Sequence, residues 1–371
     1  MRILFVHSRM VGGGIERVTL TLIEEFQKRG IECCLALRHA SGDFIDEANA
    51  LTDVIELAGS GMHRFVPGLS GLIRRFEPTH IVTAMPDVTL LTMVARWRAA
   101  SRAVVVQGVH LTQARVAHAA GVRGWLRNKF ERALGRIAYR RVHAAVAVSE
   151  GIRQELTEEF GVADDRAVLI HNPIVKDCHI GGRDANADTN ARQTRLVAIG
   201  RLSRQKGFDV LIRALAKVQG DWRLDIFGGG SERDALAALI QSNGLGSRVF
   251  LRGHTDAPYR VLDQADWFIM PSRFEGFGVV LVEAMARGVP VLASDCPHGP
   301  REILDDGGFG ILVPPDQVDA LAAAIRDVVS GRHEFDASML RDRAKRFSVS
   351  QSVEKWTSVL ASMSGASKDY G

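Results

Sequence analysis

The sequence predicts an α/β protein with two parallel sheets, each covered by helices on both faces. Short β-branched runs alternate with amphipathic helical stretches from end to end, which is typical of this architecture. The chain has 371 residues, more than one hydrophobic core usually holds, so two domains of roughly 150–200 residues are expected. Residues 177–194 are polar, contain glycine and lack periodicity, which predicts an interdomain linker.

In the first half, the β-branched runs predict the strands of one sheet. These strands are Ile3–Ser8, Glu32–Leu37, Ile81–Thr83, Ala103–Gln107, Ala144–Ser149 and Ala167–Ile170. Helices are expected between them, most clearly at Glu16–Lys28 and Ser149–Phe160. Residues 1–176 are therefore expected to form the N-terminal domain.

The second half repeats the scheme and predicts a C-terminal domain over 195–346. Its strands are predicted at Arg195–Ile199, Arg223–Phe227, Val249–Leu251, Trp267–Met270, Val289–Ala293 and Gly310–Val313. A helix-capping pattern at Phe347–Ser350 then precedes apolar residues on one helical face, which predicts a last helix over 347–362. The small, polar residues 363–371 are expected to be a flexible tail.

The composition is that of a globular protein of the cytoplasm. Hydrophobic residues make up 46% of the chain, which leaves ample core. The apolar opening is broken at His7, far short of a signal-peptide core or of a membrane span of about 20 residues. Cys33, Cys34, Cys178 and Cys296 show no disulfide framework and no metal-ligand spacing, so free thiols are expected.

The positive charge is concentrated in one segment. Between Arg96 and Arg141, eleven basic residues stand against the single acid Glu131, so this segment carries +10 while the whole chain carries +4. A local field of this size indicates an anionic partner, such as a membrane surface, a phosphorylated lipid or a nucleic acid.

The run from Arg273 to Val291 joins a glycine loop, a helix start and two carboxylates eight residues apart, Glu275 and Glu283. The N–H groups of the loop and the positive end of a helix beginning near Gly278 would bind an anion such as a diphosphate. Glu283, about one turn into that helix, could accept hydrogen bonds from two neighbouring hydroxyls, as a ribose offers. The spacing alone proves little, because the chain has 43 acidic residues.

These residues also carry a family resemblance. Phe274–Gly278, with Glu283, resembles the Glu-x7-Glu signature of family 4 of the retaining glycosyltransferases. Further matching segments follow in the family's order: Gly12–Arg17, Val148–Glu150, His171–Pro173 and Gly200–Gly207. The resemblance implies the GT-B fold, in which two Rossmann-like domains face each other across a cleft and the C-terminal helix crosses back to the N-terminal domain. It also implies an acceptor-binding first domain and a donor-binding second domain.

The resemblance gives catalytic roles to four residues. Arg201 and Lys206 follow a predicted strand, at the edge where open α/β sheets bind ligands, and would hold the donor diphosphate. Glu275 would hold hydroxyls of the transferred sugar. His110, after the strand that ends at Gln107, resembles the family's active-site histidine and would contact the sugar or its phosphate.

The remaining candidates would bind other parts of the donor. Glu283 would hold the ribose, and the backbone near Arg252 and His254 would hold the base. The full set of donor-binding candidates is Gly13, Gly14, Arg252, His254, Phe277, Gly278, Val279, Val280 and Glu283. No Asp-x-Asp pair occurs in the chain, so neither a metal ion nor another cofactor is expected.

A basic helix is predicted over 122–141. Drawn at 100° per residue, its apolar face is expected to contain Leu126, Phe130, Ala133, Leu134 and Ile137. Another face is expected to contain Trp125, Lys129, Arg132, Arg136 and Arg140. An aromatic residue inside a cationic stripe suits an anionic membrane surface, although an acceptor-phosphate site or a solvated basic face would produce the same pattern.

Together these features predict a cytoplasmic, metal-independent, retaining hexosyltransferase. If the basic helix meets a membrane, the protein is expected to be peripheral on the inner face of the plasma membrane. It would move a hexose from a nucleoside diphosphate sugar, with UDP as the expected nucleotide, to a glycan or lipid-linked acceptor in lipopolysaccharide or cell-surface polysaccharide synthesis. One alternative is a nucleotide-sugar epimerase of the same fold. Another is a non-catalytic binder of anions or nucleic acid, which is disfavoured because a pure binder needs no donor signature; no nucleic-acid partner is expected.

Overall fold

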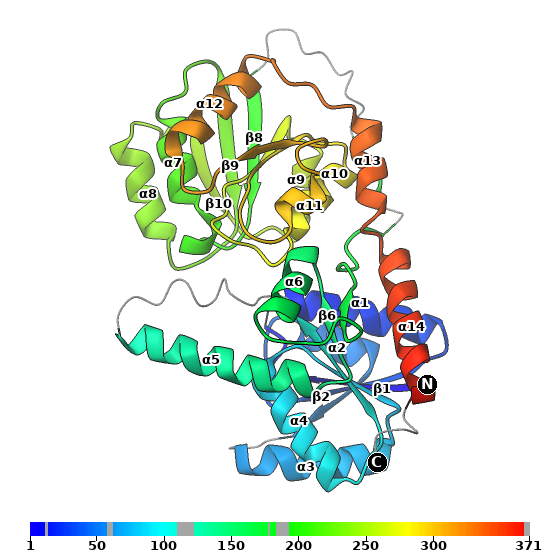
Figure 1. The fold of residues 1–371 in the computed structure, drawn as a ribbon. Coiled ribbons are helices and arrows are strands. Elements are labelled where there is room, and N and C mark those ends of the chain that lie inside the picture. The colour runs from blue at the N-terminus through cyan, green and yellow to red at the C-terminus, as the bar shows by residue number, and fades with distance from the viewer. Residues whose placement is uncertain (12–13, 58–61, 110–121, 177–178, 183–192, 367–371) are drawn as a thin grey trace. The chain divides into compact units, whose positions relative to one another are not determined.

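The structure is a computed structural model that describes residues 1–11, 14–57, 62–109, 122–176, 179–182 and 193–366. The chain forms two compact units: unit 1 comprises Met1–Pro173 and Val349–Gly371, and unit 2 comprises Ile174–Ser348. Each unit contains one sheet surrounded by helices (Figure 1). The predicted α/β class is therefore confirmed.

Unit 1 is built on a seven-stranded sheet in the order β3-β2-β1-β4-β5-β6-β7, with every pair parallel. Its strands are β1 (Arg2–His7), β2 (Glu32–Leu37), β3 (Asp53–Glu56), β4 (His80–Thr83), β5 (Val104–Val109), β6 (Ala144–Ala147) and β7 (Ala167–Leu169). The chain adds strands outward from β1 to β3 and then returns to the other side of β1, so the strand order reverses between β1 and β4.

The predicted strands of this half are present within one or two residues, but β3 was not predicted. Its four residues contain only Val54 and Ile55 as apolar side chains, between two acids. Because β3 lies at the edge of the sheet, it pairs with β2 alone and needs little apolar surface.

The helices of unit 1 cover its sheet. They are α1 (Gly14–Lys28), α2 (Ile45–Leu51), α3 (Met62–Phe76), α4 (Pro86–Arg98), α5 (Val122–Arg141), α6 (Glu150–Glu158) and α14 (Val349–Ala366). Helix α6 begins as its sequence predicts, because Ser149 is its N-cap and the Ser149 Oγ accepts a hydrogen bond from the Ile152 N–H at 3.3 Å.

Helix α14 completes the core of unit 1. Val353, Trp356 and Leu360 are buried beside residues of β1 and α1, and the Nε2–H of His80 donates to the Leu360 carbonyl at 2.8 Å. The helix runs to Ala366 instead of ending at 362, because Met363 continues the apolar face and packs against the same core. Of the expected tail, residues 367–371 lie outside the described residues.

Helix α5 forms where it was predicted, but two of the five residues of its predicted apolar face are exposed. Ala133 is exposed and Ile137 is 44% exposed, whereas Gly135 and Tyr139 are buried. The rings of Tyr139 and Phe160 meet edge to face at 5.1 Å, and a Cβ at Gly135 would lie 3.1 Å from both rings. A glycine therefore sets the contact side, because it lets α5 approach the end of α6 closely.

Unit 2 is built on a six-stranded sheet in the order β10-β9-β8-β11-β12-β13, again all parallel. Its strands are β8 (Thr194–Ile199), β9 (Trp222–Phe227), β10 (Val249–Gly253), β11 (Trp267–Met270), β12 (Val291–Ser294) and β13 (Ile311–Val313). All six match predicted strands within two residues. The strand order reverses between β8 and β11.

Helices follow most of these strands. They are the 3-10 helix η3 (Arg204–Lys206) and α7 (Phe208–Leu215), α8 (Arg233–Ser242), α9 (Pro258–Leu262), α10 (Val279–Ala286), α11 (Pro300–Ile303), α12 (Val318–Val329) and α13 (Ala337–Lys345). Trp222 is fully buried at the centre of the core that they form with the sheet. In the described part of the chain, no helix is long and apolar enough to cross a bilayer.

Candidate functional site

The candidate site of unit 2 lies at the carboxyl ends of β8 and β11. These two strands are paired, and they flank the point where the strand order reverses. In open α/β sheets this point opens the crevice that binds ligands. The loops that follow the two strands, residues 200–207 and 271–278, contain five of the thirteen predicted site residues.

An ion pair joins the two loops. Lys206 Nζ lies 2.6 Å from Glu275 Oε1, and the Ser272 hydroxyl donates to the same oxygen at 2.6 Å. Glu275 is 6% exposed, so its charge needs these partners. A carboxylate has about four acceptor positions, which leaves Glu275 able to accept hydrogen bonds from a ligand hydroxyl as well.

Gly207 allows the backbones of the two loops to touch. Its φ is +64°, a left-handed conformation, and a Cβ at this position would lie 2.0 Å from the Pro271 carbonyl oxygen. No other residue type fits both conditions. The glycine therefore fixes the end of the Lys206 loop against the start of the Glu275 loop.

Helix α10 begins directly after the second loop, with Gly278 as its N-cap at φ +102°. The N–H groups of Val279 and Val280 lie at the positive end of the helix dipole, whereas the Leu281 N–H already donates to the Gly278 carbonyl at 2.9 Å. The ring of Phe277 is 2% exposed and packs edge to face against Phe347 at 5.3 Å. Of Phe277, only the backbone can therefore face a ligand.

Glu283 is the fifth residue of α10, about one turn into the helix, as its spacing predicts. Burial raises the pKa of its carboxyl group to about 7. No hydrogen-bond or ion-pair partner for this side chain occurs among the described residues. Near neutral pH the carboxyl group can therefore both donate and accept hydrogen bonds.

The other cations of the site differ in their environment. Arg201 is exposed, and within the described chain its guanidinium bonds to no other residue. Arg252 is engaged, because its Nε lies 2.5 Å from Asp225 Oδ1 and its guanidinium stacks over the Phe250 ring at 4.6 Å. His254 is exposed beyond the end of β10. The backbone of this segment, rather than the Arg252 side chain, is thus the part open to a ligand.

Two candidates of the first half cannot be placed. His110 and Gly13 lie outside the described residues. Gly14 begins α1, and a Cβ there would contact no other atom within 4 Å, so close packing does not require glycine at this position.

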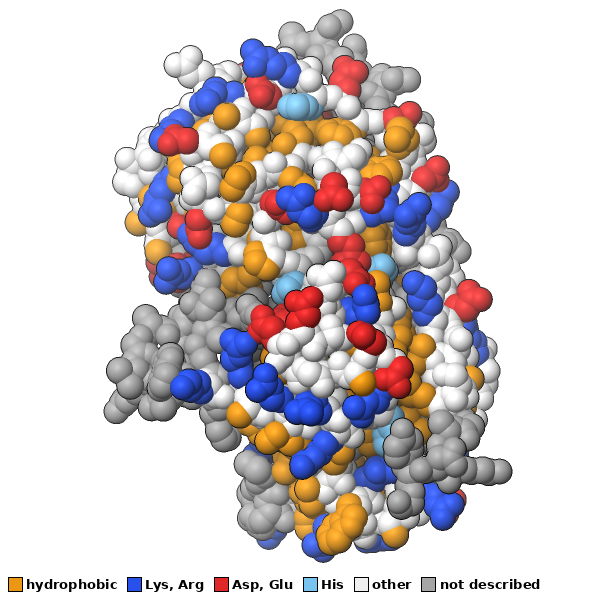
Figure 2. Space-filling view, viewed as in Figure 1, with side chains coloured by type: hydrophobic (Ala, Val, Ile, Leu, Met, Phe, Trp, Pro, Cys, Tyr) orange, Lys and Arg blue, Asp and Glu red, His pale blue; other side chains and the backbone are white. Residues whose placement is uncertain are grey.

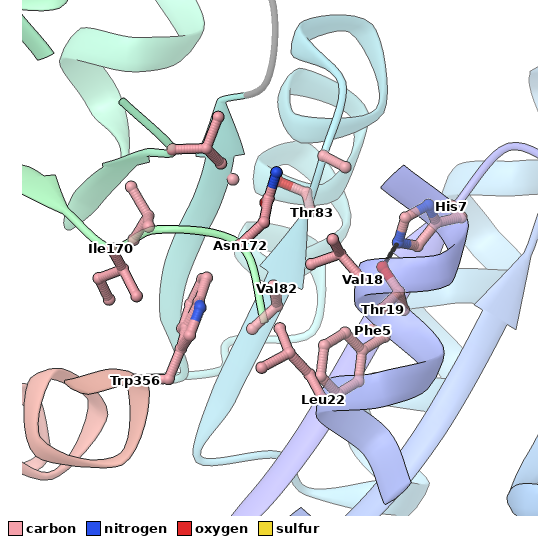
Figure 3. Close-up of a pocket in the computed structure, with 14 residues that line it drawn as sticks. Phe5, His7, Val18, Thr19, Leu22, Val82, Thr83, Ile170, Asn172 and Trp356 are labelled. Carbon is pink, nitrogen blue, oxygen red and sulfur yellow. Dashed lines mark hydrogen bonds between the residues drawn. The ribbon is translucent and has the colours of Figure 1, made fainter. Parts of the chain in front are cut away.

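Unit 1 has a small pocket where its own strand order reverses, at the ends of β1 and β4 (Figure 3). Its lining includes Phe5, His7, Thr19, Thr83, Asn172 and Trp356. His7 Nε2 and the Thr19 hydroxyl are 2.9 Å apart, and burial lowers the pKa of His7 to about 4, so this histidine is neutral at pH 7. Asn172 Oδ1 is buried and has no hydrogen-bond partner among the described residues.

Several residues that shape the candidate site of unit 2 were not predicted from the sequence. Ser272 bonds to Glu275, and Arg273 bonds to Asp209 and to the Arg204 carbonyl. Ser272 and Arg273 stand next to the recognised motif, and Asp209 opens the helix after Gly207. Their positions were a usable signal, but the partners of Arg273, Asp209 and Arg204, lie 64 and 69 residues away in sequence.

No metal site is evident in the parts that the structure describes, where no three His, Cys, Asp or Glu side chains form a group that could hold an ion.

The basic face of α5 is partly used within unit 1. Lys129, Arg132, Arg136 and Arg140 are all exposed, and Figure 2 shows basic side chains gathered in a band on this unit with acidic ones beside them. Arg132 Nη2 lies 2.5 Å from Glu159 Oε2, and Arg136 Nη2 donates to the Glu159 carbonyl at 2.7 Å. Two of the four cations therefore secure the end of α6. The side chains of Trp125, Leu126 and Phe130 lie outside the described residues.

Two family models match the chain. The model described as Glycosyltransferase Family 4 matches residues 12–177, and the model described as Glycosyl transferases group 1 matches residues 184–347. Together they cover most of unit 1 and nearly all of unit 2.

Curated relatives resemble about half of the chain. An N-acetylgalactosamine-N,N'-diacetylbacillosaminyl-diphospho-undecaprenol 4-alpha-N-acetylgalactosaminyltransferase of Campylobacter jejuni is 30% identical over 202 residues, which are 54% of this chain and 54% of the relative. A lipopolysaccharide 1,6-galactosyltransferase of Salmonella typhimurium is 28% identical over 209 residues, 54% of this chain and 56% of the relative. The similarity thus spans little more than half the length of these relatives.

Solved structures resemble nearly the whole chain. The lipopolysaccharide outer core galactosyltransferase WaaB in its apo form has a TM-score of 0.79 at 21% identity, covering 98% of this chain and 100% of that one. HepE of Anabaena in complex with UDP has a TM-score of 0.83 at 20% identity, with the same coverage. These likenesses confirm the predicted GT-B fold class.

Proposed function

This chain belongs to the glycosyltransferases of family 4, and from that premise we propose that it transfers a hexose from a nucleoside diphosphate sugar to a glycan acceptor. UDP is the proposed nucleotide, and the proposed role is in lipopolysaccharide or other surface-polysaccharide synthesis. Relatives named as galactosyl- and N-acetylgalactosaminyltransferases and a UDP-bound neighbour support these choices.

One observation carries the proposal: the Lys206–Glu275 pair at the strand-order reversal of unit 2. A nucleotide sugar presents a diphosphate beside a ring of hydroxyls. A cation and a carboxylate 2.6 Å apart offer one group for each of these. The N–H groups of Val279 and Val280 at the start of α10 add a second site for negative charge.

The difficult step of transfer is the departure of the diphosphate while positive charge develops on the sugar. Arg201, Lys206 and the α10 N-terminus would stabilise the growing negative charge on the leaving group. Glu275 would hold the sugar hydroxyls, and Glu283 would hold the ribose. The leaving phosphate oxygen would accept the proton of the acceptor hydroxyl, so that no enzymic nucleophile is required.

Binding of the donor is the first test. A thermal-shift panel of nucleoside diphosphates and their sugars should give its largest shift with UDP and one UDP-hexose. A ligand at about 100 times its dissociation constant adds roughly 2.7 kcal/mol of stability. Absence of any shift with the whole panel would contradict the proposal.

Incubation with the bound UDP-hexose alone then separates transfer from epimerisation, because an epimerase converts its donor without an acceptor.

We also propose that transfer retains the anomeric configuration and needs no metal ion. The family signature around Glu275 and Glu283 supports retention, and cations with a helix terminus at the diphosphate support metal independence. NMR of the early product should show the donor's configuration, and activity should survive excess EDTA. An inverted product, or activity lost in EDTA and restored by Mg²⁺, would contradict these points separately.

For the acceptor, we propose a lipid-linked saccharide that is reached from the anionic inner leaflet of the membrane, with α5 as the contact. The charge of +10 between Arg96 and Arg141 supports this location. Each basic residue near such a surface contributes about 1 kcal/mol. Because Arg132 and Arg136 also hold Glu159, the informative variant replaces only Lys129 and Arg140 with Ala.

Vesicle flotation tests this contact. The wild type should float with anionic vesicles at low salt and the Lys129→Ala, Arg140→Ala variant should float less. A control variant with Lys217→Ala and Lys345→Ala loses the same charge from exposed positions in unit 2 and should behave as the wild type. Equal flotation of all three would leave a soluble acceptor as the better proposal.

A further inference from the structure

Arg273 is a mostly buried residue of the loop that contains Glu275, and its side chain bonds to three other segments of unit 2. It is 12% exposed. Its Nη1 donates to the Arg204 carbonyl at 2.6 Å, and Nη1 and Nη2 donate to the two carboxylate oxygens of Asp209 at 2.8 and 2.9 Å. Its Nε donates to Asp316 Oδ1 at 2.6 Å. One guanidinium therefore ties η3, α7 and the loop after β13 to the loop after β11.

Backbone bonds join the same two loops beside Lys206 and Glu275. The Arg273 N–H donates to the Gln205 carbonyl at 2.8 Å, and Gln205 Nε2 donates to the Phe274 carbonyl at 3.0 Å. Gln205 precedes Lys206 directly, and Phe274 precedes Glu275 directly. Lys206 and Glu275, the residues proposed to face the ligand, therefore each directly follow a residue that is bonded to the other loop.

The Arg273–Asp209 contact is the kind of ion pair that fixes geometry. A guanidinium binds a carboxylate through two parallel hydrogen bonds in one plane, whereas an ammonium group acts as a point charge. Although partial burial opposes ionisation, the Arg273 guanidinium holds the pKa of Asp209 below its usual value. The pair therefore remains charged, and the cross-link remains formed, throughout the neutral pH range.

We propose that Arg273 is a positioning residue of the donor site, which sets the separation of Lys206 from Glu275 and so aligns the diphosphate with the transferred sugar. This inference rests on the proposed function, because it assigns Lys206 to the diphosphate and Glu275 to the sugar. It goes beyond the motif, since the guanidinium of Arg273 is engaged by the Arg204 carbonyl and by the carboxylates of Asp209 and Asp316. Displacement of reacting groups by about 1 Å can cost about 10²-fold in rate.

A positioning role for Arg273 predicts an effect on ligand affinity that a loss of overall stability would not produce. UDP lacks the transferred hexose, so UDP binding needs Lys206 but not its alignment with Glu275. A UDP-hexose needs both. Loss of Arg273 should therefore lower kcat and remove the difference in affinity between UDP-hexose and UDP, while UDP affinity itself changes much less.

The experiment compares Arg273→Ala, Arg273→Lys and Asp316→Asn with the wild type and with Arg213→Ala. Arg213 is a matched control, because it also pairs with Asp209, at 3.6 Å, but is 54% exposed and bonds to neither loop. Asp316→Asn removes only the charge of the acceptor in the exposed Arg273–Asp316 bond, which weakens that bond, and it provides a folded protein if Arg273→Ala does not fold. Dissociation constants for UDP and UDP-hexose are measured by calorimetry, and kcat is measured as UDP release and normalised to the number of UDP sites.

Arg273→Ala should lower kcat on the order of 10²-fold, with UDP affinity reduced less than about tenfold. Arg273→Lys should recover part of the rate, because it restores the charge but not the paired bonds. Asp316→Asn should lower kcat by a smaller factor than either, and Arg213→Ala should leave kcat unchanged.

Unchanged kcat per UDP site in all Arg273 and Asp316 variants would overturn the inference, as would equal losses of UDP and UDP-hexose affinity. Failure of the wild type to bind UDP or turn over any UDP-hexose would instead overturn the proposed function.

Discussion

Glu275 and Glu283 belong to one signature but have opposite surroundings. Glu275 has a lysine and a serine hydroxyl within 2.6 Å, whereas Glu283 has burial without a partner in the described part of the chain. Burial without a partner favours the neutral form of a carboxyl group, which is the case of Glu283. Two acids of the same site are thereby suited to different tasks, one as a fixed acceptor and one as a group that can also donate.

The raised pKa of Glu283 predicts a pH-dependent cost to folding. Its pKa rises from 4.5 to about 7, so between these pH values the folded protein binds more protons than the unfolded chain. Stability contributed by the neutral group is therefore present below pH 4.5, declines as the pH rises toward 7 and is lost above it. Glu283→Gln, which mimics the neutral acid, should become more stable relative to the wild type across this window, by no more than about 3 kcal/mol.

Urea unfolding at pH 4.5, 6 and 7.5 measures this difference. The control is Glu334→Gln, which changes an exposed acid and should show no such trend. A difference between Glu283→Gln and the wild type that does not vary with pH would contradict the assignment.

Removal of the Lys206 cation should lower turnover far more than removal of an ordinary surface lysine. Lys206→Ala leaves the buried Glu275 carboxylate with Ser272 as its remaining partner and takes a positive charge from the leaving diphosphate, so donor turnover should fall roughly 10²-fold or more. Lys217→Ala breaks an exposed pair with Asp319 of the same 2.6 Å length and should change turnover little. Consumption of UDP-hexose with acceptor present is the measurement, and similar rates in the two variants would exclude Lys206 from the site.

At the scale of single elements, much of the fold could be predicted because parallel strands are buried and apolar. Twelve predicted strands correspond to strands β1, β2 and β4 to β13. Strand β3 was not predicted from the sequence because an edge strand needs few apolar residues. The buried side of α5 was not predicted correctly because it includes Gly135, which has no side chain. A helical projection that follows apolar side chains therefore omits the close contact of Gly135 with the Phe160 ring.

The donor-side site was predictable to the extent that its residues are contiguous. The loop from Phe274 to Gly278 and the start of α10 lie where the motif indicates. Contacts between loops were not predictable, because they depend on which strands become neighbours: β8 and β11 pair although about 70 residues separate them. The bonds of Arg273 belong to this second kind.

Close backbone contact between the two loops predicts that Gly207 cannot be replaced. Gly207→Ala adds a Cβ 2.0 Å from the Pro271 oxygen and should lower both the melting temperature and donor turnover. Gly244→Ala is the matched control, because Gly244 has a similar φ of +68° but no atom within 4 Å of the added Cβ. It should incur only the conformational cost of roughly 1–2 kcal/mol and keep normal turnover. Equal effects of the two substitutions would mean that the contact with Pro271 has no functional role.

At the scale of the whole molecule, unit 1 is discontinuous in sequence and unit 2 is a continuous segment within it. Helix α14 brings Val353, Trp356 and Leu360 into a core whose members outside α14 lie before residue 171. The stability of unit 1 therefore depends on the last helix of the chain.

Trp356→Ala should destabilise unit 1 by about 3–5 kcal/mol, because it leaves a cavity where a side chain of 5% exposure was packed. Trp97→Ala removes the same side chain from a position that is 80% exposed and should change stability by no more than about 0.5 kcal/mol. Urea unfolding followed by circular dichroism compares them. A small effect of Trp356→Ala would show that α14 is not needed for the core.

The discontinuity of unit 1 also determines the order in which the protein can be completed on the ribosome. Residues 174–348, which form unit 2, emerge after the first 173 residues and before α14. At about 5–20 residues per second, the nascent first unit waits roughly 10–35 seconds for Trp356 and for the Leu360 carbonyl that receives the His80 hydrogen bond. During translation, the part of the chain that is made first is therefore the part that finishes folding last.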